Sequence, residues 1–161
     1  EIAAVAKLFG LVSSIVGVVI GGAAVARLGT VRSLVLGSLA VIASNLMFMT
    51  LAFQGEPSAV GLAIVVSADN LAMGIAGTAL IAYLSSLTSA SYTATQYALF
   101  SSMYALPGKL LMGTSGFVVD AVGYPWFFVY TSSLGIPALV MLYFLYDEKK
   151  ILGSLKKYGY E

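Results

Sequence analysis

The sequence predicts an all-α, polytopic helical membrane protein with about five transmembrane helices, and three observations support this. First, 60% of the 161 residues are hydrophobic and only 9% are charged, whereas a soluble domain carries about 25% charged residues. Second, the apolar residues gather in runs near or above the roughly 20 residues that a helix needs to cross a bilayer. Third, short segments rich in Gly, Pro and Ser separate these runs. The runs are 3–26, 33–53, 59–88, 94–119 and 126–146.

Small residues predict which of these helices pack closely. The first run carries a stripe of them and the third run a similar group: Gly10, Ser14, Gly17 and Gly21, then Gly74, Gly77 and Thr78. Such residues let helix backbones approach one another within a membrane. The second and fifth runs hold mostly large apolar side chains, apart from Asn45 and the polar step at 131–133. We therefore expect these two runs to face lipid. The fourth run is the least apolar of the five.

Basic residues predict the orientation of the chain. Arg27 and Arg32 lie between the first two runs, and four lysines lie in a basic tail, residues 147–161. The connections on the opposite side hold only Glu56 and Asp120 as charged residues. Because cytoplasmic segments are enriched in Lys and Arg, we expect the N-terminus outside and the tail in the cytoplasm. The chain does not begin with Met, and we expect it to be a fragment of a longer protein.

The residue types that the chain lacks exclude several kinds of site. It has no cysteine and no histidine, which removes thiolate metal centres, disulfides and the commonest general base. We therefore predict no metal and no cofactor, and a net charge of +1 gives no reason to expect nucleic acid. A membrane-embedded enzyme would depend on Asp69, Lys109 and hydroxyl groups, and no spacing of nucleophile and base indicates one. We do not expect an enzyme.

Two charged residues lie deep within apolar runs, Asp69 in the third and Lys109 in the fourth. Each lies about ten residues from the outer end of its run, so the two should have similar depth on neighbouring helices. An ionised side chain there costs at least about 2.5 kcal/mol. One interpretation is a pair whose protonation is coupled to transport, and the other is a permanent ion pair that joins two helices. Lys7 lies near enough to the end of the first run to reach water.

Further polar residues on the third and fourth runs are candidate contacts for a solute: Asn70, Tyr83, Gln96 and Tyr104. Tyrosine and glutamine can offer hydrogen bonds to sugar or peptide groups. In the fourth run, Pro107 removes a helical hydrogen bond and Gly108 follows it, which predicts a hinge. 

Two segments resemble signature regions of the major facilitator superfamily. Residues 22–32, Gly-Ala-Ala-Val-Ala-Arg-Leu-Gly-Thr-Val-Arg, resemble its loop pattern Gly-x-x-x-Asp-Arg-x-Gly-x-x-(Arg/Lys), with Ala26 in place of the acidic residue. Residues 116–127 resemble the junction before its last helix. The resemblance implies that Arg27, Gly29 and Arg32 belong to a cytoplasmic gating loop.

A more specific resemblance, to the AmpG-type muropeptide permeases, covers most of the chain. It rests on Asp69-Asn70-Leu71 and on the block Tyr-Thr-Ala-Thr-Gln-Tyr-Ala-Leu at 92–99. It implies that the five runs are the eighth to twelfth helices of a transporter, most of one six-helix half, without the N-terminal half. It also implies a proton symporter that imports anhydro-muropeptides across the inner membrane of a Gram-negative bacterium for cell-wall recycling.

Two alternatives stay open beside this interpretation. One is a carrier of acetyl-CoA or of another small solute from the same wider family. An acetyl-CoA carrier should show more cations in the cavity because CoA carries phosphates. A structural membrane subunit would use Asp69 and Lys109 only as an ion pair that holds helices together.

Overall fold

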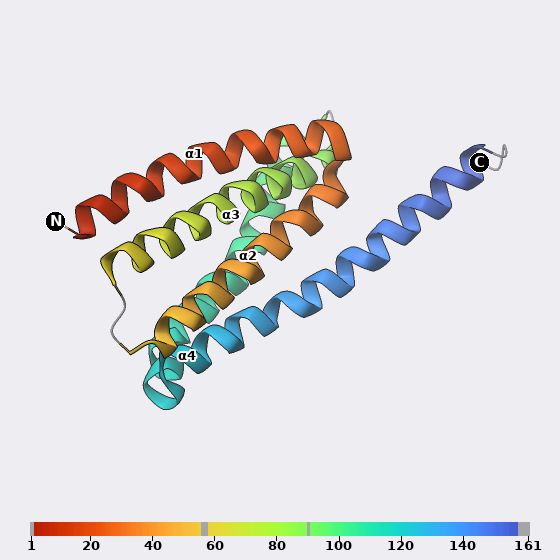
Figure 1. Ribbon diagram of the computed structural model, residues 1–161. Helices are drawn as coiled ribbons and strands as arrows, with labels where there is room; N and C mark the ends of the chain where they lie inside the picture. Colours follow the sequence, from red (N-terminus) through yellow and green to blue (C-terminus); the bar gives the residue numbers. More distant parts are fainter. Residues whose placement is uncertain (1, 56–57, 90, 158–161) are drawn as a thin grey trace.

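The structure, a computed structural model, describes residues 2–55, 58–89 and 91–157, and it describes side chains from residue 9 to residue 146 within those ranges. This part of the chain forms four helices: α1 (Ile2–Leu28), α2 (Thr30–Phe53), α3 (Ala59–Ser86) and α4 (Thr93–Lys157). Each contains a segment long and apolar enough to cross a membrane. Figure 1 colours these helices along the sequence, from red in α1 to blue at the end of α4. The prediction of an all-α polytopic membrane protein is confirmed.

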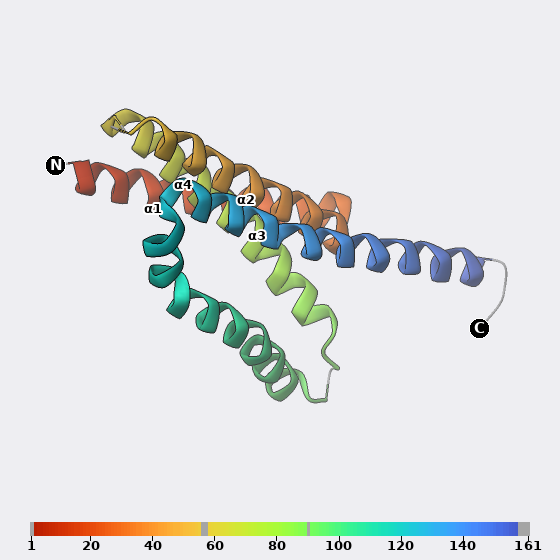
Figure 2. The same ribbon diagram turned by 90° about the horizontal axis from the view of Figure 1, so that it is seen from below.

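Within its described residues the structure has four such helices where the sequence predicts five spans, because the last two predicted spans lie in one element, α4, which joins two helices across a kink. A straight helix of 65 residues would extend roughly 100 Å, about three times the thickness of the hydrocarbon core. The α4 backbone leaves helical geometry at Gly123, and the chain reverses direction in that region (Figures 1 and 2). We call residues 93–122 the first arm of α4 and residues 124–157 its second arm.

Single glycines make the sharp turns at both ends of this bundle. Gly29 joins α1 to α2 with φ 84° and ψ 164°, and Gly123 joins the two arms of α4 with φ 78° and ψ 164°. This backbone region is essentially restricted to glycine. Pro125 follows within the first turn of the second arm, where a missing N–H costs little.

α3 is the central helix and lies between α1 and α2 (Figure 1). The small residues of α1 allow its close approach to α3. A Cβ added to Gly17 would lie 3.0 Å from Leu71 Cα and 3.1 Å from Gly74 Cα, and would overlap the Leu71 carbonyl oxygen. The small residues of the first and third runs were predicted to mark closely packing faces, and the structure shows that Gly17 and Gly74 meet each other there. Gly77 is an exception, because a Cβ at this position would meet nothing within 4 Å.

The second arm of α4 packs antiparallel along α2. The rings of Phe48 and Phe128 stack with centroids 5.1 Å apart, and Thr131 Oγ1 donates a hydrogen bond of 3.1 Å to Asn45 Oδ1. The two runs expected to face lipid therefore also pack against each other. The first arm stands away from the other helices in Figure 2, and many of its large apolar side chains are exposed, Phe117 by 78%.

Candidate functional site

The carboxylate of Asp69 faces α2, where it meets a serine. Asp69 Oδ1 lies 2.8 Å from Ser44 Oγ, and this hydrogen bond joins the middle of α3 to the middle of α2. Ser44 is only 2% exposed, and Asp69 is half-buried. A polar pair in an apolar bundle is stable only when its members satisfy each other. Asp69 and Ser44 therefore form the polar centre of the α2–α3 interface.

The Ser44 hydroxyl has two hydrogen-bond acceptors within reach and one hydrogen to donate. Ser44 Oγ lies within hydrogen-bond distance of two acceptors, Asp69 Oδ1 at 2.8 Å and the Val41 carbonyl oxygen at 2.9 Å, but a hydroxyl has one hydrogen to donate. An ionised Asp69 receives that hydrogen. A protonated Asp69 can donate its own hydrogen to Ser44, which then donates to Val41. The contact is compatible with either protonation state of the carboxyl group.

The neighbouring residue, Asn70, faces the opposite helix. Ser14 on α1 donates a hydrogen bond of 3.0 Å to Asn70 Oδ1, and Asn70 Nδ2 donates to the Val66 carbonyl at 2.8 Å. Gly10 leaves room for the amide, since a Cβ there would lie 3.1 Å from Asn70 Nδ2. The Asp69-Asn70 step thus connects the central helix to both of its neighbours, with the carboxylate toward α2 and the amide toward α1.

Lys109, the predicted partner of Asp69, lies on the first arm of α4 with an exposed side chain. Within the described residues no ion pair or hydrogen bond joins it to Asp69, whose hydrogen bond goes to Ser44. The reason is the position of the first arm, which makes few contacts with α3. The roles predicted for the two charges in proton coupling stay predictions.

The other predicted solute contacts are not gathered at one point. Gln96 Oε1 accepts a hydrogen bond of 2.7 Å from the Ser89 backbone N–H, so this amide holds the turn before α4. Tyr104 is 60% exposed on the first arm, and Tyr83 is half-buried near the end of α3. Of the four, Asn70 is the one that lies beside Asp69.

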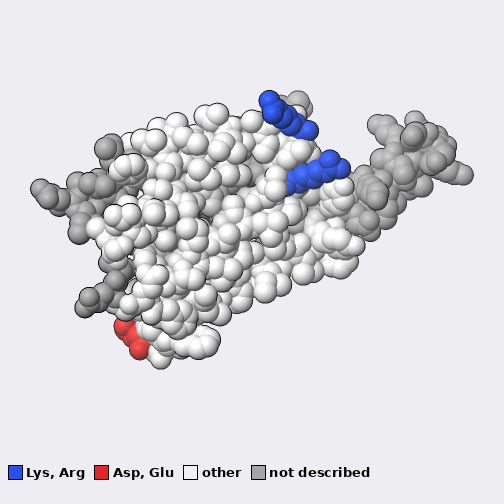
Figure 3. All heavy atoms as spheres, in the orientation of Figure 1, with Lys and Arg blue, Asp and Glu red and all other residues white. Residues whose placement is uncertain are grey.

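The predicted gating segment is the tight turn between α1 and α2. Arg27 lies in the last turn of α1, where a cation favours the helix dipole. Arg32 lies in the first turn of α2, and its guanidinium donates a hydrogen bond of 3.0 Å to the Tyr146 hydroxyl. Figure 3 shows basic side chains at this end of the molecule and an acidic one at the opposite end. That charge distribution agrees with the pattern on which the predicted orientation rests.

The predicted hinge lies in regular helix. Pro107 and Gly108 are inside the first arm, and Gly123 is the one residue of α4 with non-helical backbone angles. The hinge stays a prediction. The side chains of Lys7, Glu56 and the basic tail, 147–161, lie outside the described part of the chain.

Sequence reasoning missed Ser44 and Ser14 as polar partners. A usable signal existed for Ser44, because it precedes Asn45 in a mostly apolar run and lies about as far from the α2–α3 turn as Asp69 does. Ser14 was treated only as a small residue for close packing. Among the described residues, no group of three or more His, Cys, Asp or Glu side chains could hold a metal ion.

Comparison with known proteins finds relatives along nearly the whole chain. A protein of Rickettsia conorii named "Putative transporter AmpG 4" is 36% identical over 145 residues, 90% of this chain. A protein of Rickettsia bellii named "Putative transporter AmpG 1" is 33% identical over 142 residues, 88% of this chain. The chain spans about a third of the length of these relatives, 35% and 34% respectively. No protein-family profile matches the chain.

Proposed function

From the sequence similarity of this chain to the AmpG-type transporters, which covers 90% of its length, we propose that it is part of a secondary transporter in the inner membrane. The complete protein takes up anhydro-muropeptides together with protons, and this chain supplies most of the C-terminal half. Proton-coupled transporters of this kind bind solute near the middle of the membrane, between two halves that alternate in access.

The structural observation that supports proton coupling at Asp69 is its contact with Ser44 within an apolar bundle. A carboxyl group inside a membrane is expensive when ionised and marks a functional site by default. Ser44 Oγ, 2.8 Å from Asp69 Oδ1, can donate to an ionised carboxylate or accept from a protonated one. The Asp69 carboxyl group can therefore gain or lose a proton while α2 and α3 stay in contact. Such a group can bind and release a proton in each transport cycle.

Lys109 has a different role in this proposal. It is an exposed cation on an arm with many exposed apolar side chains, and a charge facing lipid would be expensive. We expect the rest of the transporter to cover this face, with Lys109 contacting a carboxylate of the solute. Asn70, Tyr83, Gln96 and Tyr104 are the proposed polar contacts, and Pro107-Gly108 is the proposed hinge.

The competing interpretation is that Asp69 only fastens α3 to α2. The variant Asp69→Asn separates the two roles, because asparagine still accepts the hydrogen of Ser44 but does not titrate. If the role is proton coupling, the full-length variant should express and melt like the wild type, yet lose accumulation of labelled anhydro-muropeptide driven by a proton gradient. Asp120→Asn, which removes an exposed carboxylate, should accumulate solute normally.

Proton-driven accumulation at the wild-type rate by Asp69→Asn would contradict the coupling role. No gradient-driven uptake by the wild type would contradict the transporter proposal itself. The acetyl-CoA alternative is tested in the same assay: an excess of unlabelled anhydro-muropeptide should block uptake, while an excess of acetyl-CoA should leave it unchanged.

A further inference from the structure

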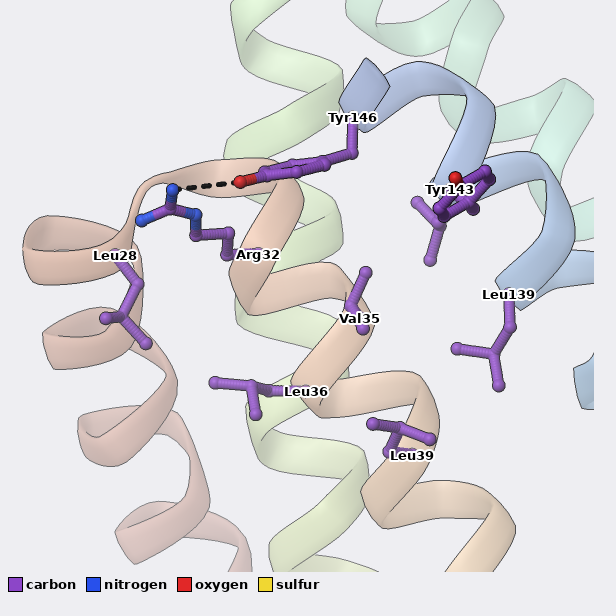
Figure 4. Close-up of a pocket in the computed structure, with 9 residues that line it drawn as sticks. Leu28, Arg32, Val35, Leu36, Leu39, Leu139, Tyr143 and Tyr146 are labelled. Carbon is purple, nitrogen blue, oxygen red and sulfur yellow. Dashed lines mark hydrogen bonds between the residues drawn. The ribbon is translucent and has the colours of Figure 1, made fainter. Parts of the chain in front are cut away.

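A groove runs between α2 and the second arm of α4 at the end of the bundle that carries Arg27 and Arg32. It encloses about 620 Å³, within the range of small-molecule sites in proteins. Its walls are almost wholly apolar and are formed mainly by Leu36 and Leu39 on one side and Leu139 and Leu142 on the other. We call it the α2–α4 groove. Figure 4 shows labelled leucines on α2 and on the second arm of α4, with Leu28 at the end of α1 beside them.

Among the described residues that line this groove, Arg32 is the one cation. The Arg32 guanidinium lies beside Tyr146, with a hydrogen bond of 3.0 Å to its hydroxyl and 5.5 Å from Cζ to the ring centroid. Figure 4 shows the two side chains together at one end of the groove. The contact with Tyr146 restrains Arg32, and Tyr143 adds a second amphipathic ring nearby. Tyrosine and arginine are typical of the level at which lipid headgroups meet the acyl chains.

The shape and charge of the groove specify its occupant. An apolar channel in a membrane-facing surface suits an acyl chain, and a guanidinium at its end suits a phosphate, to which arginine can donate two parallel hydrogen bonds. A purely apolar helix packed in the groove, as an alternative occupant, would offer no anion to Arg32. We propose that the α2–α4 groove binds an anionic phospholipid, with a chain along the leucines and the phosphate at Arg32. This inference requires the chain to lie in a membrane but does not rest on the proposed transport activity.

The test uses the purified full-length protein in detergent and measures its melting temperature with added lipid. Dioleoylphosphatidylglycerol should raise the melting temperature in a saturable way, dioleoylphosphatidylcholine should raise it much less, and inorganic phosphate should have no effect. Equal stabilisation by the two lipids would overturn the role of Arg32 as an anion site. Stabilisation by phosphate alone would show that the groove does not take an acyl chain.

Matched variants locate the site. Arg32→Gln should weaken phosphatidylglycerol binding roughly fivefold, the worth of one cation at a membrane surface. Arg27→Gln removes the same charge from an exposed residue that does not line the groove, and should change binding less than twofold. Leu139→Trp should fill the groove and block binding, whereas Val140→Trp, on an exposed neighbour, should not. Equal effects within either pair would overturn the proposed site, as would occupation of the groove by a second copy of the protein in a crosslinking experiment.

Discussion

Gly29 and Gly123 adopt nearly the same backbone conformation, φ 84° and ψ 164° in one and φ 78° and ψ 164° in the other. Each stands alone between two long helical segments and reverses the chain. Each also has another glycine before it in the chain at the same spacing, Gly22 before Gly29 and Gly116 before Gly123. The bundle thus uses one kind of turn twice, at Gly29 between α1 and α2 and at Gly123 between the arms of α4.

We predict that Gly29→Ala and Gly123→Ala each destabilise the full-length protein by about 1–3 kcal/mol, because residues that carry a side chain rarely adopt this backbone conformation. Gly22→Ala and Gly116→Ala are the matched controls, since a Cβ at either position meets nothing within 4 Å. Unfolding in denaturing detergent gives the free energies. The prediction fails if the turn variants are no less stable than their controls.

A second prediction concerns the close approach of α1 to α3. Gly17→Ala should cost about 1–3 kcal/mol, the usual penalty for overpacking, because the added Cβ meets the backbone at Leu71 and Gly74. Gly77→Ala adds the same methyl group in open space and should be neutral. Thermal unfolding of the two variants in parallel measures the difference, and equal melting temperatures would contradict the packing described.

Removal of the Ser44 hydroxyl tests the polar centre. Ser44→Ala leaves the half-buried Asp69 carboxylate without its hydrogen-bond partner, which costs about 1–3 kcal/mol. Thr50→Ala removes a hydroxyl that bonds only within its own helix, to the Met47 carbonyl, and should have a much smaller effect. If Asp69 is the proton site, Ser44→Ala should also shift the pH dependence of uptake, and Thr50→Ala should not. An unchanged stability in Ser44→Ala would show that the bond contributes nothing.

The hydrogen bond between Asn45 and Thr131, 3.1 Å long, joins α2 to the second arm of α4. A double-mutant cycle with Asn45→Ala and Thr131→Val should give a coupling energy of about 0.6 kcal/mol, the average for such bonds within membranes. Ser133 donates to the Tyr130 carbonyl of its own helix, so a cycle of Asn45→Ala with Ser133→Ala should give a value near zero. Similar coupling in both cycles would argue against the contact.

Orientation can be tested because the chain contains no cysteine. In a full-length protein freed of any other cysteines, Asp120→Cys should react with a membrane-impermeant maleimide added to intact cells. Arg27→Cys should react only after the membrane is permeabilised, since we expect the basic end in the cytoplasm. The reverse pattern of labelling would invert the proposed topology.

Composition and periodicity were sufficient for the parts of this protein that depend on local residue type. Runs of apolar residues predict helices that cross a membrane, because a backbone in hydrocarbon must satisfy its own hydrogen bonds. The small residues near Gly17 and Gly74 predict that each of these helices has a closely packing face, for a steric reason that needs no coordinates. Similarity to the AmpG-type transporters was also recognisable from the motif at 69–71 and the block at 92–99.

The tertiary structure was needed wherever a contact depends on how helices are rotated and placed. Equal depth suggested Asp69 and Lys109 as partners, but depth leaves open which face each helix presents. The first arm of α4 stands away from α3, and the carboxylate turns instead to Ser44, 25 positions earlier in the chain. Arg32 and Tyr146, 114 positions apart, meet for a similar reason: the reversal at Gly123 returns the second arm along α2. Residue type determines which side chains must be buried and which polar groups need a hydrogen-bond partner. Only the packing of the helices determines which partner each polar group finds.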